Sequence, residues 1–153
     1  MAKFRFKYEA VLKQRQVAEE QAQRELAVHL RERGRIRDQL TGMQQSVRDS
    51  KQQLSAGLVG HVDVERIREF ARYSGQVTLQ AQHALGELAQ VEQRAEAARA
   101  ALAEAMRQRK AIEVLRDKQY QHWLSEQRRK ETMELDELAV QRYARGLNME
   151  STT

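Results

Sequence analysis

The stretch LSAGLVGHVDVERI, residues 54–67, places Gly57 and Gly60 close together in a chain that contains no proline. Glycine adopts backbone conformations that residues with a side chain resist, so two glycines in one short stretch favour a chain reversal. Asp63 has a short polar side chain of the kind that caps a helix N-terminus, which predicts a helix starting at Val64. The stretch therefore indicates a turn between two helices.

Seams of the coiled-coil type run along the sequence on both sides of this turn. Before it, alternating steps of four and three residues meet Ala22, Leu26, His29, Arg33, Ile36, Leu40, Met43 and Val47, with Leu54 one heptad later. After it, the same stepping meets Ala81, Ala84, Leu88, Val91, Ala95, Ala98, Leu102, Ala105, Arg109 and Ile112. Because such a stripe covers only about two residues in seven, neither helix is expected to be stable alone in water.

These seams predict an all-α fold in which two long helices pack as an antiparallel coiled-coil hairpin. We expect a single domain over residues 1–153, with a first helix at about residues 5–56, a turn at residues 57–62 and a longer second helix at about residues 63–145. Centring the reversal near residue 59 or 60 makes the numbers of facing residues sum to about 119, so the second helix extends about 30 residues beyond the first. A parallel homodimer, in which the glycines only kink the helix, is the alternative fold.

The composition excludes a thick hydrophobic core. Only 5% of the residues are aromatic and 32% are charged, while proline is absent, which is typical of long helices. The absence of cysteine excludes disulfides and thiolate metal sites and favours a reducing compartment, so we expect a cytoplasmic protein. The N-terminus lacks the apolar run of a secretory signal, and no stretch approaches the roughly 20 apolar residues that span a bilayer.

The basic residues, which outweigh the acidic ones to give a formal charge of +5, are concentrated in two segments far apart in the sequence. Residues 1–15 hold five basic residues against one glutamate, and residues 107–130 hold eight against three acidic residues. Antiparallel pairing would bring residues 1–15 and 104–118 together at the open end of the hairpin. This juxtaposition predicts an acidic partner there, while a solvated charged face is the simpler interpretation.

The sequence contains no pattern that predicts catalysis or a bound cofactor. The four histidines, at positions 29, 61, 83 and 122, include no pair three or four residues apart, so we expect no metal site. A glycine-rich phosphate loop, a nucleophile elbow and a shielded carboxylate pair are also missing. We therefore expect a protein with no catalytic residues, no cofactor and no small-molecule substrate.

A first aromatic group lies just after the turn. Phe70, Tyr73 and Val77 have the spacing i, i+3 and i+7, so they share one face of the second helix, and the pairing places Met43 and Val47 opposite. Two interpretations are open. These side chains extend the core between the helices, or they form a docking patch, since an aromatic cluster is large for a seam that elsewhere uses alanine.

A second aromatic group, formed by Tyr120, Trp123 and Leu124, lies on a part of the second helix that the first helix does not reach. Its cover comes either from aromatic residues near the N-terminus or from the socket of a partner protein. The N-terminal candidates are Phe4, Phe6 and Tyr8.

The chain opens with FRFKYEAVLKQRQVAEEQAQRELA, residues 4–27, and closes with RRKETMELDELAVQRYAR, residues 128–145. Separated by two long predicted helices, these stretches resemble the FliJ family, the small coiled-coil component of the bacterial flagellar type III protein export apparatus. The more specific parts of the resemblance are the aromatic and basic start with EAVL, and LDELA near the end.

The resemblance implies a stalk-like hairpin similar to the coiled coil of the rotary ATPase gamma subunit. A member of this family binds the hexameric flagellar export ATPase and also contacts the membrane export gate protein and export chaperones. It promotes ring assembly and couples ATP hydrolysis to export without hydrolysing ATP itself. The implied protein is a non-enzymatic monomer, cytoplasmic and peripheral on the cytoplasmic side of the bacterial inner membrane.

The resemblance also implies which residues meet these partners. Those that match the family's opening motif, and are implied to bind the ATPase ring, are Phe4, Arg5, Phe6, Leu12, Lys13 and Arg15. Those implied by position and residue type to bind the export gate are Phe70, Tyr73 and Val77. A further partner-binding group is formed by Tyr120, Trp123 and Leu124.

A basic coiled-coil protein that binds nucleic acid or another anionic surface is the alternative function. Acidic residues interrupt its basic segments, and no basic region continues directly into a leucine zipper, which argues against this class. Binding to duplex DNA with a steep dependence on salt would favour it.

Overall fold

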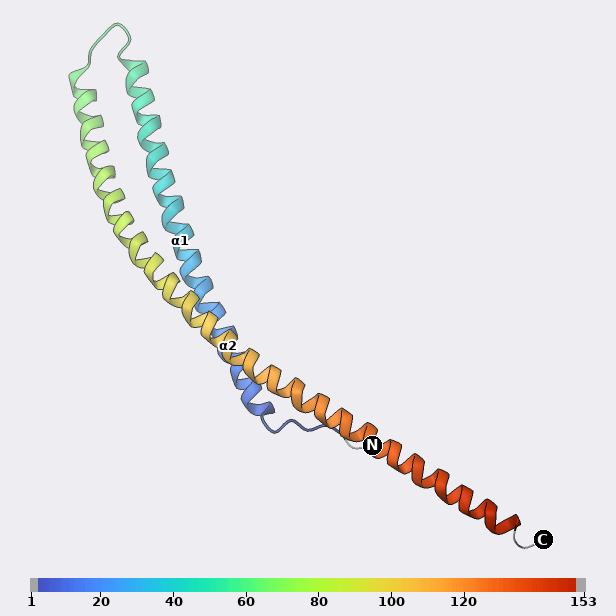
Figure 1. The fold of residues 1–153 in the computed structure, drawn as a ribbon. Helices are drawn as coiled ribbons and strands as arrows, with labels where there is room; N and C mark the ends of the chain where they lie inside the picture. Colours follow the sequence, from blue (N-terminus) through green and yellow to red (C-terminus); the bar gives the residue numbers. More distant parts are fainter. Residues whose placement is uncertain (1–2, 151–153) are drawn as a thin grey trace. The chain divides into compact units, whose positions relative to one another are not determined.

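The protein consists of two long helices joined by one short connection (Figure 1). α1 comprises Glu9–Gly57, and α2 comprises Val64–Glu150. The computed structural model describes residues 3–150, with side chains described for residues 3–146, and this part of the chain contains no strand. The prediction of an all-α hairpin with a longer second helix is confirmed.

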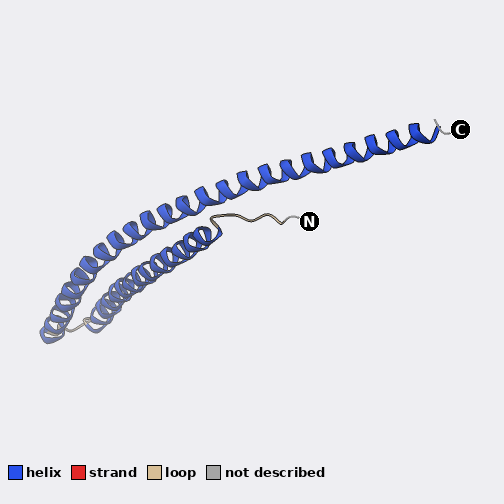
Figure 2. Cartoon of the chain, turned by 90° about the horizontal axis from the view of Figure 1, so that it is seen from below, coloured by secondary structure: helices blue, strands red, loops and turns tan. Residues whose placement is uncertain are grey.

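The chain divides into two compact units, and both helices pass from one unit into the other. The hairpin unit is Ala18–Ala105, in which α1 and α2 lie side by side and run antiparallel (Figures 1 and 2). The terminal unit consists of Met1–Val17 together with Met106–Thr153. The helices therefore pair within one chain, as the antiparallel hairpin requires.

Burial in the hairpin unit follows the predicted seams. Ile36 is fully buried, with 0% of its surface exposed, and forms a cluster with Ala84 and Val91 that Leu40 and Leu88 flank. Every predicted seam residue of the unit is buried or half-buried. Because alanine projects only a methyl group, the alanines of α2 leave room for the larger side chains of α1 between the two backbones.

The connection between the helices is built as the sequence predicts. Gly60 has a φ of 84°, in the left-handed region that strains residues with a side chain. Asp63 caps α2, because its Oδ1 accepts hydrogen bonds from the backbone N–H groups of Glu65 at 3.0 Å and Arg66 at 3.4 Å. Gly57 ends α1 where an added Cβ would lie 2.7 Å from Nη1 of Arg66. The glycines and the cap together fix where the chain reverses.

The helix ends differ from the predicted ones. α1 starts at Glu9, later than the predicted start near residue 5, because residues 3–8 alternate basic and aromatic side chains. This period of two suits an extended backbone, in which successive side chains point to opposite sides. α2 continues past Gly146 to Glu150 and so exceeds the predicted end near residue 145. A single glycine costs a helix only about 1 kcal/mol, which is too little to end it.

The register in the terminal unit is shifted from the predicted one. Arg15 Nη1 donates a hydrogen bond to Gln108 Oε1 at 2.5 Å, and Arg116 Nε forms an ion pair with Glu9 Oε2 at 3.4 Å. The predicted sum of about 119 places Arg15 opposite residue 104 and Glu9 opposite residue 110, which are four and six residues earlier in α2 than the partners observed. The shift arises because the centre of the reversal follows Gly60 and because long polar side chains reach beyond the positions directly opposite them.

We expect Ile36→Ala to lower the free energy of unfolding by about 2 to 5 kcal/mol, because it removes the largest side chain of the buried cluster and leaves a cavity. Urea denaturation followed by circular dichroism measures this loss. Val28→Ala is the matched control, since Val28 is 53% exposed on the same helix. Equal losses for the two variants would contradict the assignment of Ile36 as the centre of the seam.

We expect Gly60→Ala to destabilise the protein by about 1 kcal/mol, because alanine is strained at a positive φ. Gly42→Ala should instead stabilise it by up to about 1 kcal/mol, because Gly42 lies inside α1 with no atom within 4 Å of an added Cβ. Thermal melting of both variants compares these effects. Stabilisation by Gly60→Ala would show that the connection does not require a left-handed residue.

Candidate functional site

Residues 3–8, which we call the N-terminal strap, end in a turn at Lys7 and Tyr8. The strap places the ring of Phe4 on the C-terminal half of α2 within the terminal unit. The Phe4 ring packs edge-on against Tyr120, with 5.3 Å between centroids, and lies 5.8 Å from the ring of Trp123. Tyr120 and Trp123 are stacked on each other at 5.9 Å. Such aromatic pairs contribute about 0.5 to 1.5 kcal/mol each beyond the area that they bury. Phe4 therefore supplies the N-terminal cover that the sequence offered as one of two alternatives.

The other aromatic residues of the strap do not cover Tyr120 and Trp123 in this way. Phe6 is buried, with 8% of its surface exposed, and packs edge-on against Tyr8 at 5.8 Å. Leu124, the third member of the group with Tyr120 and Trp123, is half-buried. The strap is thus anchored at two places, at Phe4 and at Phe6.

The residues implied to bind the ATPase separate into two kinds in the structure. Phe6 and Leu12 are buried, and Arg15 is half-buried and donates its hydrogen bond to Gln108. Arg5 and Lys13 are exposed. The side chains that hold the strap and the start of α1 in place are therefore Phe4, Phe6, Leu12 and Arg15. The two exposed cations face solvent.

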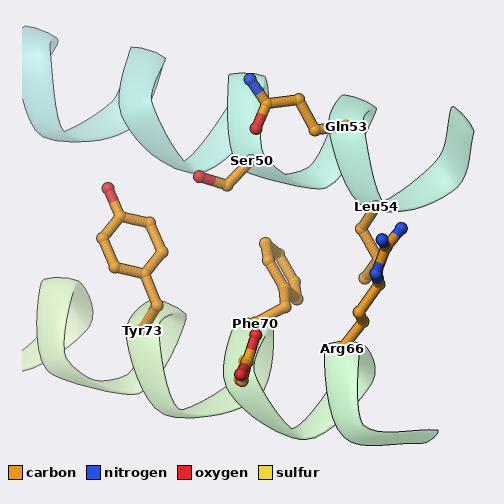
Figure 3. A pocket seen from close by; sticks show the side chains of 7 residues that line it. Ser50, Gln53, Leu54, Arg66, Phe70 and Tyr73 are labelled. Atoms are coloured by element: carbon orange, nitrogen blue, oxygen red, sulfur yellow. The ribbon is translucent and has the colours of Figure 1, made fainter. Parts of the chain in front are cut away.

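Near the turn, Phe70 and Tyr73 point from α2 towards α1 (Figure 3). They line a cavity of about 340 Å³ together with Ser50 and Leu54 of α1. Phe70 is half-buried, whereas 37% of the surface of Tyr73 is exposed. Phe70 therefore extends the seam between the helices, and Tyr73 lies at its edge.

Val77 lies one step further along the same face and is also half-buried. It lines a groove of about 650 Å³ with Met43 and Val47, the two residues expected opposite it. Arg48 and Lys51 of α1 line the same groove. The three residues implied to bind the gate thus share one face but do not form one pocket, since Phe70 and Tyr73 line a different cavity.

Sequence reasoning assigned no role to the last part of α2, although its apolar side chains are exposed. Every residue from 131 to 146 is exposed. The large apolar members are Met133, Leu135, Leu138, Val140 and Tyr143, with 52% to 73% of their surfaces exposed. Met133 and Val140 lie on one side of the helix, and Leu135 and Leu138 lie on the opposite side. The signal that could have found them is LDELA, whose two leucines fall outside the predicted seam.

The polar pairs of the helices lie at their surfaces. Arg35 donates hydrogen bonds to Glu32 at 2.6 and 3.1 Å and thereby lowers the pKa of the Glu32 carboxyl below its usual range.

Among the residues that the structure describes, no group of three or more His, Cys, Asp or Glu side chains is placed to hold a metal ion. Nor does the described chain contain a helix with the length and apolar character required to cross a bilayer.

Comparison with known proteins points to one family. The family model described as Flagellar FliJ protein matches residues 4–148. Comparisons with curated proteins and with solved structures gave no significant match. The matched range includes the N-terminal strap from Phe4 onwards, all of α1 and nearly all of α2. The chain therefore belongs to the FliJ family, and it is a component of the flagellar type III export system.

Proposed function

We propose that the protein is a non-enzymatic coiled-coil stalk of the export apparatus. It binds the hexameric export ATPase and the membrane export gate or its chaperones, and it couples ATP hydrolysis to protein export. It acts in the cytoplasm and at the cytoplasmic side of the inner membrane. The observation that supports this proposal most strongly is the family match, which extends over both helices and the strap.

The strap and the start of α1 carry the proposed contact with the ATPase. Arg5 and Lys13 are exposed, so an acidic surface can approach them without disturbing the packing of Phe6 and Leu12. Cations in such positions steer an acidic partner towards the surface and set its orientation. The buried residues of the set act indirectly, because they hold the cations in position.

The exposed end of α2 supports a partner that surrounds the helix. Met133 and Val140 project from one side and Leu135 and Leu138 from the other, all exposed to solvent. A helix that is apolar on opposite sides cannot bury both against one flat surface. The lumen of a ring can cover both sides, and the strap belongs to the same terminal unit as this end of α2.

The proposed contact with the gate lies in the hairpin unit. Phe70 and Val77 are half-buried, so the accessible member of this group is Tyr73. Tyrosine presents a large apolar ring and a hydroxyl group, a combination that is enriched in residues that dominate binding energy. The gate contact therefore depends on Tyr73 more than on its two neighbours.

We expect Lys13→Glu to weaken binding to the export ATPase about fivefold to tenfold, because it places a negative charge against an acidic surface. Isothermal titration calorimetry at physiological salt measures the dissociation constant. Lys51→Glu is the control, since it makes the same change of charge on α1 in the hairpin unit. Unchanged affinity for Lys13→Glu would remove this end of the chain from the ATPase contact.

We expect Tyr73→Ala to weaken binding to the cytoplasmic part of the export gate about tenfold while leaving the melting temperature nearly unchanged. Phe70→Ala should lower the melting temperature by several degrees, because Phe70 packs against α1. Pull-down with the purified gate domain and thermal melting separate the two effects. If Tyr73→Ala loses stability but keeps its affinity for the gate, the group is core and not a docking patch.

A further inference from the structure

A groove lies where the N-terminal strap runs along α2 in the terminal unit. Its volume is about 530 Å³, and Phe4 and Trp123 provide its aromatic surface. Three cations line it as well, Lys3 and Arg5 from the strap and Lys118 from α2. The strap thus brings together residues that are more than 100 positions apart in the sequence.

The three cations of the groove make no ion pair with any other described residue. All three are exposed, and in residues 3–150 none of them takes part in a hydrogen bond or an ion pair. Glu9, the acidic residue nearest to the strap in sequence, is paired with Arg116. Like charges held together in this way repel one another, and an anion placed between them relieves the repulsion.

The aromatic surface of the groove can hold an apolar side chain. The Phe4 and Trp123 rings are tilted by 54° to each other, and both line the groove. Trp123 is half-buried, which leaves part of the indole accessible from the groove. Tryptophan in a concave site surrounded by polar groups is typical of residues that anchor a bound peptide.

We propose that this groove binds an acidic peptide segment of a partner protein. Carboxylates of the segment lie against Lys3, Arg5 and Lys118, and one apolar side chain of the segment packs against the rings of Phe4 and Trp123. The choice of partner rests on the proposed function, in which the terminal unit binds the export ATPase. A peptide fits better than an anionic membrane surface, because Phe4 and Trp123 pack on each other, whereas insertion into a bilayer requires protruding apolar side chains.

Trp123 is the only tryptophan of the chain and lines the groove, so tryptophan fluorescence reports on this region. The full-length protein is titrated with a short synthetic peptide in which Glu and Asp flank a single Leu. We expect a saturable change in Trp123 emission that weakens with added salt, and no change with the peptide in which Lys replaces Glu and Asp. An absence of saturable change with the acidic peptide would overturn the proposal.

The double variant Arg5→Glu with Lys118→Glu should weaken binding of the acidic peptide by about tenfold or more. The matched control is Arg31→Glu with Arg72→Glu, which makes the same change of charge at two exposed positions of the hairpin unit and should leave the affinity unchanged. Circular dichroism verifies that both variants keep their helices. If both double variants weaken binding equally, the peptide responds only to the net charge of the protein, and the proposal that it binds in the groove is wrong.

Two further measurements separate this inference from its alternatives. If the export ATPase binds the wild-type protein and the Arg5→Glu, Lys118→Glu variant equally well, the groove is not its contact, although the proposed function stands. If the wild-type protein binds the acidic peptide at the groove but not the ATPase, the groove stands and the proposed function fails. A change in Trp123 emission with phosphatidylglycerol vesicles, and none with the peptide, would overturn the inference in favour of a lipid surface.

Discussion

The packing of α1 against α2 along a narrow seam is the interaction on which the rest of the structure depends. Each helix buries only a stripe of side chains, and most of its surface is solvated. Isolated helices of this composition gain too little from their own hydrogen bonds to be stable in water. The buried cluster around Ile36 supplies the missing free energy, because a side chain of this size contributes about 1.5 to 3 kcal/mol when it is removed from water. Polar residues at other seam positions contribute less free energy, so most of the stability of the helix pair comes from the apolar seam residues.

The terminal unit uses a different means of attachment. Here the strap is held by aromatic contacts and by a few long polar side chains, including the Arg15 hydrogen bond to Gln108 and the ion pair of Glu9 with Arg116. The ion pair is partly exposed, and such pairs contribute about 0 to 1 kcal/mol. The buried side chains of Phe6 and Leu12, together with the ring contacts of Phe4, therefore hold this unit together more than the charges do. Because apolar contacts hold the strap in place, its cations remain available to a partner.

A family assignment and a physical interpretation of the surfaces support the same kind of protein. The helices offer long surfaces with separate apolar and basic regions, which suits a component that contacts several partners. In the proposed function, the terminal unit contacts the ATPase and the hairpin unit contacts the gate. The same basic groove that would receive an acidic segment is completed only when the strap lies on α2. Binding at this surface therefore depends on the strap, because Lys3 and Arg5 belong to it.

The sequence by itself determined the two helices, the position of the reversal and the seam residues. These features follow from local chemistry and from period, since glycine and a capping aspartate mark the turn and a heptad stripe marks the buried side of a helix. The start of α1 at Glu9 was not predicted, because the helical pattern was extended back into the alternating basic and aromatic residues of the strap. Only the tertiary structure decided that Phe4 covers Trp123, that Phe70 packs while Tyr73 is accessible, and that Lys118 joins Lys3 and Arg5 around one groove. The physical reason is that these contacts join residues far apart in the chain, and their geometry depends on the exact register and on where the strap leaves the helix, neither of which a repeating pattern specifies.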